Sequence, residues 1–333
     1  MKKTNPETHQ VCRSLLQKAV RRGNTRLTRE VARHLYDIGD TSWLRSRTAI
    51  ITFEECWPLG AQQSNQTNID GILETLTNTA KAIKVKDAAG LGSLAYEYST
   101  GDRSVLLNVS EDKAIEQVCK AIKEPERFWD WAKKTCSNNE QLALVASAHK
   151  AYRRGGWPWD RAFMQAAAYL AVSTNRLEVL PSAPKQEDFP LWVALDKHTD
   201  HGKAALRETA KIIGLSARQM MWVSFYCESA LLNDATDSYW WSREIQWRLS
   251  RFGLDYDKAK AIWSKAQPII AEILKEQTQW LQEHLNQSVS SDCTQKAVEA
   301  PYSQEGLWKL PTSEATFNVQ SLSQPVQSSL PGF

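Results

Sequence analysis

Apolar side chains recur every three or four residues along most of this chain, which is the spacing of an amphipathic helix. The first two stretches of this kind cover residues 8–23 and 25–38, and each ends at a glycine. A third helix is predicted from 40 to 51, because Asp40 can cap its first turn. The same spacing predicts further helices at 69–85, 111–123, 125–131, 141–152, 158–171, 203–214, 216–232, 239–252 and 255–285.

Alternation of apolar and polar residues with period two, the pattern of a half-buried strand, is almost absent. The one short candidate is 105–109. The glycine-rich stretch 86–92 is expected to be a flexible turn, and the polar stretch 62–68 is expected to be a loop. Pro268, inside the last predicted helix, is expected to cause a kink or a new helix start. The pattern therefore predicts an all-α protein.

Three prolines fall within residues 181–190, which makes this stretch the clearest predicted linker. It separates two predicted helical lobes, at 8–180 and 190–285. From residue 286 onward the chain is rich in Ser, Gln, Thr and Pro, so residues 286–333 are expected to form a disordered tail.

The composition is that of a soluble globular protein, with 42% hydrophobic and 24% charged residues. No apolar run approaches the roughly 18 residues of a membrane span, and no apolar signal core follows the basic N-terminus. We therefore expect a cytoplasmic protein without membrane contact. The six cysteines are scattered without a Cys-x-x-Cys pair, which disfavours a disulfide scaffold or a zinc ribbon. No catalytic residue, metal site or cofactor is predicted.

Positive charge is concentrated near the N-terminus. Residues 1–50 carry eleven lysines and arginines against four acids, an excess of seven positive charges. Such an excess favours DNA or another polyanion as a partner, although a solvated helix face is the alternative. The basic turns near Gly23 and Gly155 suggest one phosphate-facing surface formed by Lys18, Arg21, Arg22, Arg26, Arg153 and Arg154.

The chain contains fourteen tryptophans, several of them in clusters. Tryptophan at helical spacing is more often packed in a core than used as a platform for bases, so we expect most of them to be buried. In the segment 240–248, Trp240, Glu244 and Trp247 share one helix face, and Arg248 lies beside it. An arginine beside tryptophan can form a cation–π contact, although structural packing is the favoured interpretation of this segment.

Several short motifs follow one another in a set order: the basic turn 18–23, Gly39-Asp40, the segment 44–47, Phe53-Glu-Glu55, Gly156-Trp-Pro158 and the segment 165–171. Together they resemble the C-terminal helical region of the clamp-loader-like AAA+ ATPases called MgsA or RarA. The resemblance implies a fold like a clamp-loader collar, with 60–140 as an insertion, and self-association into a homo-oligomer. No Gly-x-x-x-x-Gly-Lys-[Ser/Thr] phosphate loop occurs, so ATP hydrolysis is not expected.

The densest polar cluster is the segment 196–203, which contains Asp196, His198, His201 and Lys203. Its His-x-x-His spacing could bind a metal or move a proton. Its Gly-Lys step at a helix start could instead bind phosphate. The simplest alternative is a helix cap supplied by Thr199 or Asp200, in a solvated turn.

The chain ends with a possible docking peptide. Gln327, Leu330 and Phe333 resemble the short motifs with which bacterial proteins bind the sliding clamp. Such a peptide would insert its apolar side chains into a preformed pocket, while the glutamine amide bonds to neighbouring backbone. A sliding clamp or another replication protein is therefore a predicted partner.

These features predict a non-enzymatic factor in DNA replication, recombination or repair, which acts by self-association and by binding DNA or a replication protein. Two alternatives stay open. One is an assembly protein of a mobile element or defence system without DNA contact, and the other is an enzyme that uses the cluster at 196–203. The salt dependence of DNA binding separates the first two, because phosphate contacts weaken steeply as salt rises.

Overall fold

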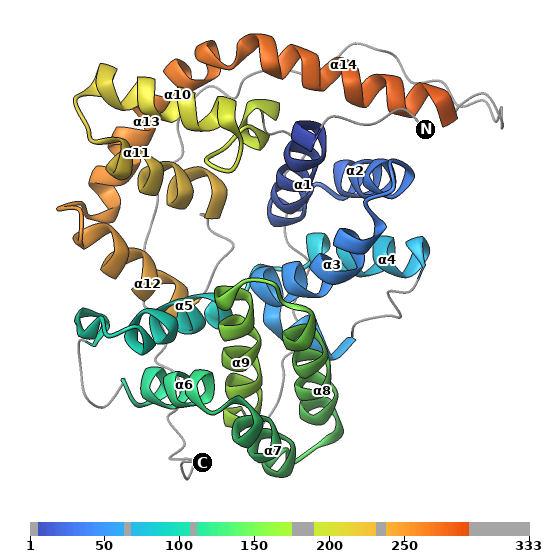
Figure 1. The fold of residues 1–333 in the computed structure, drawn as a ribbon, viewed down its shortest axis with the longest axis vertical. Helices are drawn as coiled ribbons and strands as arrows, with labels where there is room; N and C mark the ends of the chain where they lie inside the picture. Colours follow the sequence, from blue (N-terminus) through green and yellow to red (C-terminus); the bar gives the residue numbers. More distant parts are fainter. Residues whose placement is uncertain (1–5, 63–67, 107–111, 175–189, 231–237, 293–333) are drawn as a thin grey trace.

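The computed structural model describes residues 6–62, 68–106, 112–174, 190–230 and 238–292, and every named element in these ranges is helical (Figure 1). The prediction of an all-α protein is confirmed. The β-type pairing found in this part of the chain is a single isolated bridge between Cys56 and Val85. No helix in these ranges has the length and hydropathy needed to cross a bilayer.

The helices follow one another in two groups on either side of residues 175–189. The first group comprises α1 (Pro6–Arg21), α2 (Thr25–Asp37), α3 (Thr41–Cys56), η1 (Trp57–Gln62), α4 (Ile69–Lys81), α5 (Asp87–Ser99), η2 (Arg103–Val105), α6 (Lys113–Lys123), α7 (Pro125–Thr135), α8 (Asn139–Arg154) and α9 (Pro158–Ser173). The second comprises η3 (Leu191–Ala194), α10 (Asp200–Ile213), α11 (Ala217–Ser224), the π-helical η4 (Phe225–Ala230), α12 (Tyr239–Ser250), α13 (Tyr256–Ile273) and α14 (Lys275–Asp292). Every predicted helix corresponds to one or two of these elements.

The apolar faces of the helices form two hydrophobic clusters. One cluster joins α1, α2 and α4 to η3 and to α10–α14, in the upper part of Figure 1. The other joins α5–α9 in the lower part. Helices α3, α5 and α12 contribute side chains to both clusters and so connect them. The predicted lobes at 8–180 and 190–285 therefore do not each enclose a core, because the first helices pack against the last ones.

Helix α5 lies where a flexible turn is predicted, so the prediction for 86–92 is wrong. The helix packs against α6, α9 and α12, and its glycines permit this close approach. A Cβ atom on Gly90 would lie within 3.0 Å of the backbone of Trp240 and Trp241. One on Gly92 would also lie within 3.0 Å of the backbone of Ala162. The stretch 60–140, which the resemblance implies to be an insertion, thus contains α4 and the central helix α5.

Six of the fourteen α-helices in the described ranges begin where a short polar side chain accepts a hydrogen bond from an N–H group of the first turn. The residues that do this are Asn24, Asn68, Asn138, Thr199, Ser216 and Asp255. Thr199 was one of the two predicted caps of α10. Asp40 does not cap α3, because its carboxylate accepts two hydrogen bonds of 2.6 Å from the guanidinium of Arg13.

Several other helix ends differ from the predictions by a few residues, and two differences concern predicted breaks near the end of the described ranges. Helix α13 continues through Pro268 and ends at Ile273. Proline has no N–H group to donate to the carbonyl of Ser264. The helix tolerates this loss because both residues lie on its exposed face. Helix α14 extends to Asp292, beyond the predicted tail boundary at residue 286. Residues 293–333 of that tail, most of the linker at 181–190, and most of the loop at 62–68 lie outside the described residues.

Replacing Gly90 with alanine tests the close contact between α5 and α12. The new methyl group has no room against the α12 backbone, so the free energy of unfolding should fall by roughly 1–3 kcal/mol or more. Gly156→Ala is the control, because nothing lies within 4 Å of its Cβ position and its φ is not positive. Urea denaturation measures both changes. Equal stability of the two variants would contradict the packing described here.

Candidate functional site

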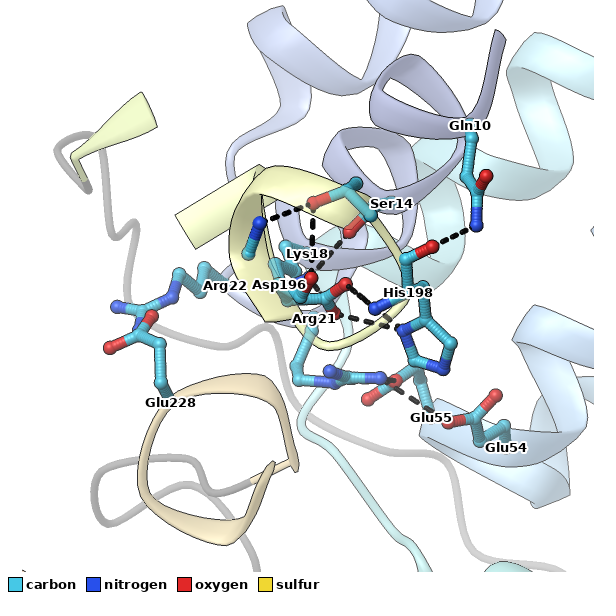
Figure 2. Close-up of polar contacts among 12 residues, drawn as sticks. Gln10, Ser14, Lys18, Arg21, Arg22, Glu54, Glu55, Asp196, His198 and Glu228 are labelled. Atoms are coloured by element: carbon cyan, nitrogen blue, oxygen red, sulfur yellow. Dashed lines mark hydrogen bonds and ion pairs between the residues drawn. The ribbon is translucent and has the colours of Figure 1, made fainter. Parts of the chain in front are cut away.

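Basic residues of α1 point into the protein, where they meet acids from distant parts of the chain (Figure 2). The ammonium of Lys18 donates to the carboxylate of Asp196 over 2.6 Å and to the hydroxyl of Ser14 over 2.6 Å. Lys18 is 3% exposed. Because Asp196 lies in the turn before α10, this ion pair fastens the first helix to the second half of the chain.

Arg21 occupies the next turn of α1 and is also buried. Its guanidinium lies 2.7 Å from a carboxylate oxygen of Glu55 and 3.2 Å from one of Glu54, at the end of α3. The ammonium of Lys86 reaches the other oxygen of Glu55 over 2.9 Å, so Glu55 faces two buried cations. We refer to Lys18, Arg21, Glu55, Lys86 and Asp196 as the buried ionic network.

The carboxylates of the buried ionic network stay ionised in the folded protein. Burial alone would raise the pKa of Glu55, but Arg21 and Lys86 outweigh this effect and lower the pKa to about 2. Burial likewise opposes ionisation of Asp196, yet Lys18 and His198 hold the pKa of its carboxyl well below its usual range. Both carboxylates of the network therefore carry their negative charge at neutral pH.

This arrangement corrects the predicted phosphate-facing surface. Lys18 and Arg21 are buried with their acids and cannot reach a nucleic acid, and Arg22 pairs with Glu228 of the π-helix. Arg26 is exposed on α2 and lies 3.7 Å from its helical neighbour Glu30. The remaining members, Arg153 and Arg154, are exposed at the end of α8. The structure thus does not bring the six residues together.

The polar cluster at 196–203 is divided in a similar way. Asp196 belongs to the buried ionic network, and the ring of His198 lies 3.0 Å from it with a 58% exposed side chain. Lys203 forms an exposed pair with Asp200, and His201 is exposed. The hollow beside Asp196 has a volume of about 10 Å³, which is about the size of one water. In the described ranges, no three His, Cys, Asp or Glu side chains are grouped to hold a metal ion.

A second buried group of charges fills the predicted face of α12. Glu244 accepts hydrogen bonds from the hydroxyl of Tyr226 at 2.6 and 2.7 Å and lies 3.3 Å from the guanidinium of Arg248. The guanidinium of Arg248 lies over the ring of Trp247, 4.5 Å from its centre, so the cation–π contact considered for this segment is present. These contacts are structural, because the residues are buried between α5 and α12.

One group of exposed cations lies on α7 and α8. They line an open hollow of about 360 Å³, whose walls are Lys133, Ala146, His149, Lys150, Arg153 and Arg154. Four of these residues carry a permanent positive charge, and all four are exposed. In the part of the chain that the structure describes, none of the four has a carboxylate within 4.0 Å. We refer to this feature as the basic hollow.

The local sequence accounts for the basic hollow. Lys150, Arg153 and Arg154 stand at positions i, i+3 and i+4 of α8, which place them on one helix face. Helix α7 adds Lys133 from the opposite wall. The ring of His149 stacks on Trp129 at 4.6 Å and forms the floor. Burial, together with the nearby charges of Lys133 and Arg153, lowers the pKa of His149, so the imidazole is neutral at pH 7.

Sequence reasoning found Arg153 and Arg154 but missed Lys133, His149 and Lys150. The helical spacing of 150, 153 and 154 was visible in the sequence. The contribution of Lys133 was not, because it depends on how α7 packs against α8. The predicted docking residues Gln327, Leu330 and Phe333 lie outside the described residues.

Comparison with protein-family models, curated proteins and solved structures finds no match to this chain. Two of the motifs behind the resemblance to MgsA and RarA nevertheless meet in space, because Arg21 of the turn 18–23 binds the acids of Phe53-Glu-Glu55. This contact explains why a basic turn and an acidic helix end occur together in the sequence. The family relationship itself stays a prediction.

The buried ionic network predicts how stability depends on pH. Unfolded Glu55 takes up its proton near pH 4.5, whereas folded Glu55 stays ionised until about pH 2, so its contribution is present above pH 4.5 and is lost as the pH falls toward 2. Glu55→Gln leaves Lys86 buried without its carboxylate and Arg21 with Glu54 alone. It should cost roughly 3–5 kcal/mol at pH 7, and the difference from the wild type should shrink below pH 4.5.

Urea denaturation at a series of pH values measures this difference. The matched control is Glu30→Gln, which removes a partly exposed acid from an i,i+4 pair and should change stability by less than about 1 kcal/mol. A stability loss in Glu55→Gln that is the same at pH 3 and pH 7 would contradict the described network.

Proposed function

We propose that the protein is a non-enzymatic factor in DNA replication, recombination or repair, and that it contacts DNA phosphates through the basic hollow of α7 and α8. The observation that carries this proposal is the presence of four exposed cations around one hollow without carboxylate partners in the described part of the chain. Phosphate contacts by Lys and Arg supply most of the affinity of proteins for DNA regardless of sequence.

The ordinary explanation for basic residues at a helix end accounts for only part of this surface. Lys and Arg in the last turn interact favourably with the helix dipole, which suffices for Arg153 and Arg154. It also applies to Lys133, which is in the last turn of α7, but it does not explain Lys150 or why cations from two helices line the same hollow. Several other basic side chains in the described ranges are paired with acids, as in the pairs of Lys18, Arg21 and Arg22.

The nature of the hollow also favours an anion over an apolar ligand. Its volume falls at the lower end of the roughly 300–1,000 Å³ of small-molecule sites, but such sites are lined mainly by hydrophobic and aromatic side chains. Here five of the six lining residues carry nitrogen groups. An enzyme built on 196–203 has less support, because Asp196 is held by Lys18 and the hollow beside it has room for about one water.

The resemblance to MgsA and RarA supports the place of this activity in DNA transactions. We therefore retain self-association and a sliding clamp or other replication protein as proposed partners. An assembly protein of a mobile element or defence system remains the alternative, and it requires no DNA contact.

The double variant Arg153→Glu, Arg154→Glu tests the proposed DNA surface. Its affinity for a fluorescently labelled DNA at low salt should fall at least about tenfold. The slope of log affinity against log salt should decrease by about two, because two phosphate contacts are lost. Fluorescence anisotropy at several salt concentrations measures both quantities.

The control is Lys258→Glu, Lys265→Glu, which makes the same change in charge on exposed positions of α13, on the other side of the molecule in Figure 1. It should bind DNA nearly as the wild type does. Equal binding by all three proteins would refute the proposed surface. Absence of DNA binding by the wild type would favour the assembly alternative.

A peptide of residues 322–333 tests the clamp partner separately. It should bind the host's sliding clamp weakly, at about micromolar concentration, because ordering a short peptide opposes binding. Gln327→Ala and removal of Phe333 should each weaken binding, which fluorescence polarisation measures. The tail is not a docking motif if all three peptides bind equally or none binds.

A further inference from the structure

Trp157 is the most exposed large apolar side chain in the described ranges, at 68%. Most other tryptophans there are buried, as predicted, and the next most exposed is Trp280, at 43%. A large aromatic ring exposed to this extent is accessible to a stacking partner.

We propose that the basic hollow takes single-stranded DNA in preference to duplex, with Trp157 as a platform on which an unpaired base stacks. This inference rests on the proposed function and specifies the class of its ligand. Helix α8 ends at Arg154, the turn Gly155-Gly156 follows, and Trp157 precedes α9. The ring thus lies three residues after Arg154 and four after Arg153, two of the cations of the hollow.

The turn that carries Trp157 is well fixed. The N–H group of Gly155 donates to the carbonyl of Ala151 over 2.9 Å, and the guanidinium of Arg161 donates to the carbonyl of Gly155 over 3.1 Å. Arg161 also lies over the ring of Tyr152 at 5.7 Å. Because the backbone before Trp157 is held in place, base stacking has mainly the side-chain torsions of the ring left to order, which favours binding.

The two tryptophans of this turn differ in their surroundings. Trp159 lies against the ring of Tyr96, with 5.0 Å between the ring centres, and is 38% exposed. Trp157 has no aromatic ring partner in the described part of the chain. Trp159 therefore has a structural role in holding α9 to α5, whereas the contacts within the described chain assign none to the Trp157 ring.

The combination of cations and an open ring discriminates between the two forms of DNA. Phosphates are present on single strands and duplexes alike, so the hollow alone would bind both. Bases offer their faces to a tryptophan only when they are unpaired and unstacked. A cationic groove with an aromatic platform is accordingly the arrangement by which proteins bind single strands without sequence preference.

The experiment compares a labelled 15-nucleotide oligothymidine with a blunt 15-base-pair duplex, using the full chain and fluorescence anisotropy. Trp157→Ala should weaken binding of the single strand about five- to hundredfold, the range found for loss of one base–aromatic stack, and should leave duplex binding unchanged. Trp157→Phe should retain most of the affinity because it keeps a ring. Trp280→Ala, on α14, is the control and should change neither affinity.

Two outcomes overturn the inference without touching the proposed function. In the first, Trp157→Ala binds the single strand as the wild type does, while Arg153→Glu, Arg154→Glu still fails to bind. In the second, Trp157→Ala weakens the single strand and the duplex equally. Unchanged binding by the arginine double variant would instead refute the proposed function, and with it this inference. Circular dichroism and the melting temperature confirm that each variant folds.

Discussion

The placement of ionised groups inside the protein constrains the rest of this fold. Taking Lys18, Arg21 and Lys86 out of water is expensive, and the cost is offset only when Glu55 and Asp196 approach within hydrogen-bond distance. That condition can be met in one relative arrangement of α1, the end of α3, the start of α5 and the turn before α10. The network therefore selects this packing from others that would bury equal apolar area. The same arrangement gives the two hydrophobic clusters, to which α3, α5 and α12 all contribute side chains.

How much of the fold the sequence predicts depends on whether the signal is local. The helices at 8–23 and 25–38 were predictable because periodicity and terminal glycines act within a few residues. The error at 86–92 has a distant cause. Two glycines in seven residues resemble a turn, but Gly90 is required by the backbone of Trp240 and Trp241, which lie 150 and 151 residues further along. No window of a single sequence contains that contact.

The candidate site shows the same limit for charge. The excess of seven positive charges in residues 1–50 is real, but acids from elsewhere neutralise much of it, among them Glu54, Glu55, Asp196 and Glu228. A count along the chain does not include the partners that folding supplies. The cations of α8 were predictable in part because positions 150, 153 and 154 define one helix face whatever that helix packs against.

The ion pair between Lys18 and Asp196 has a consequence for the order in which the chain folds during its synthesis. The two residues are 178 positions apart. At about 5–20 residues per second, a ribosome needs roughly 10 to 40 seconds to add the acid after the lysine. Through that interval α1 must keep its ammonium in water, so the cluster that runs from Val11 to Leu281 closes only late in synthesis. The helices α5–α9, whose partners are nearer in sequence, can pack together first. Helix α1 can complete its packing only after η3 and the helices that follow it have been synthesised.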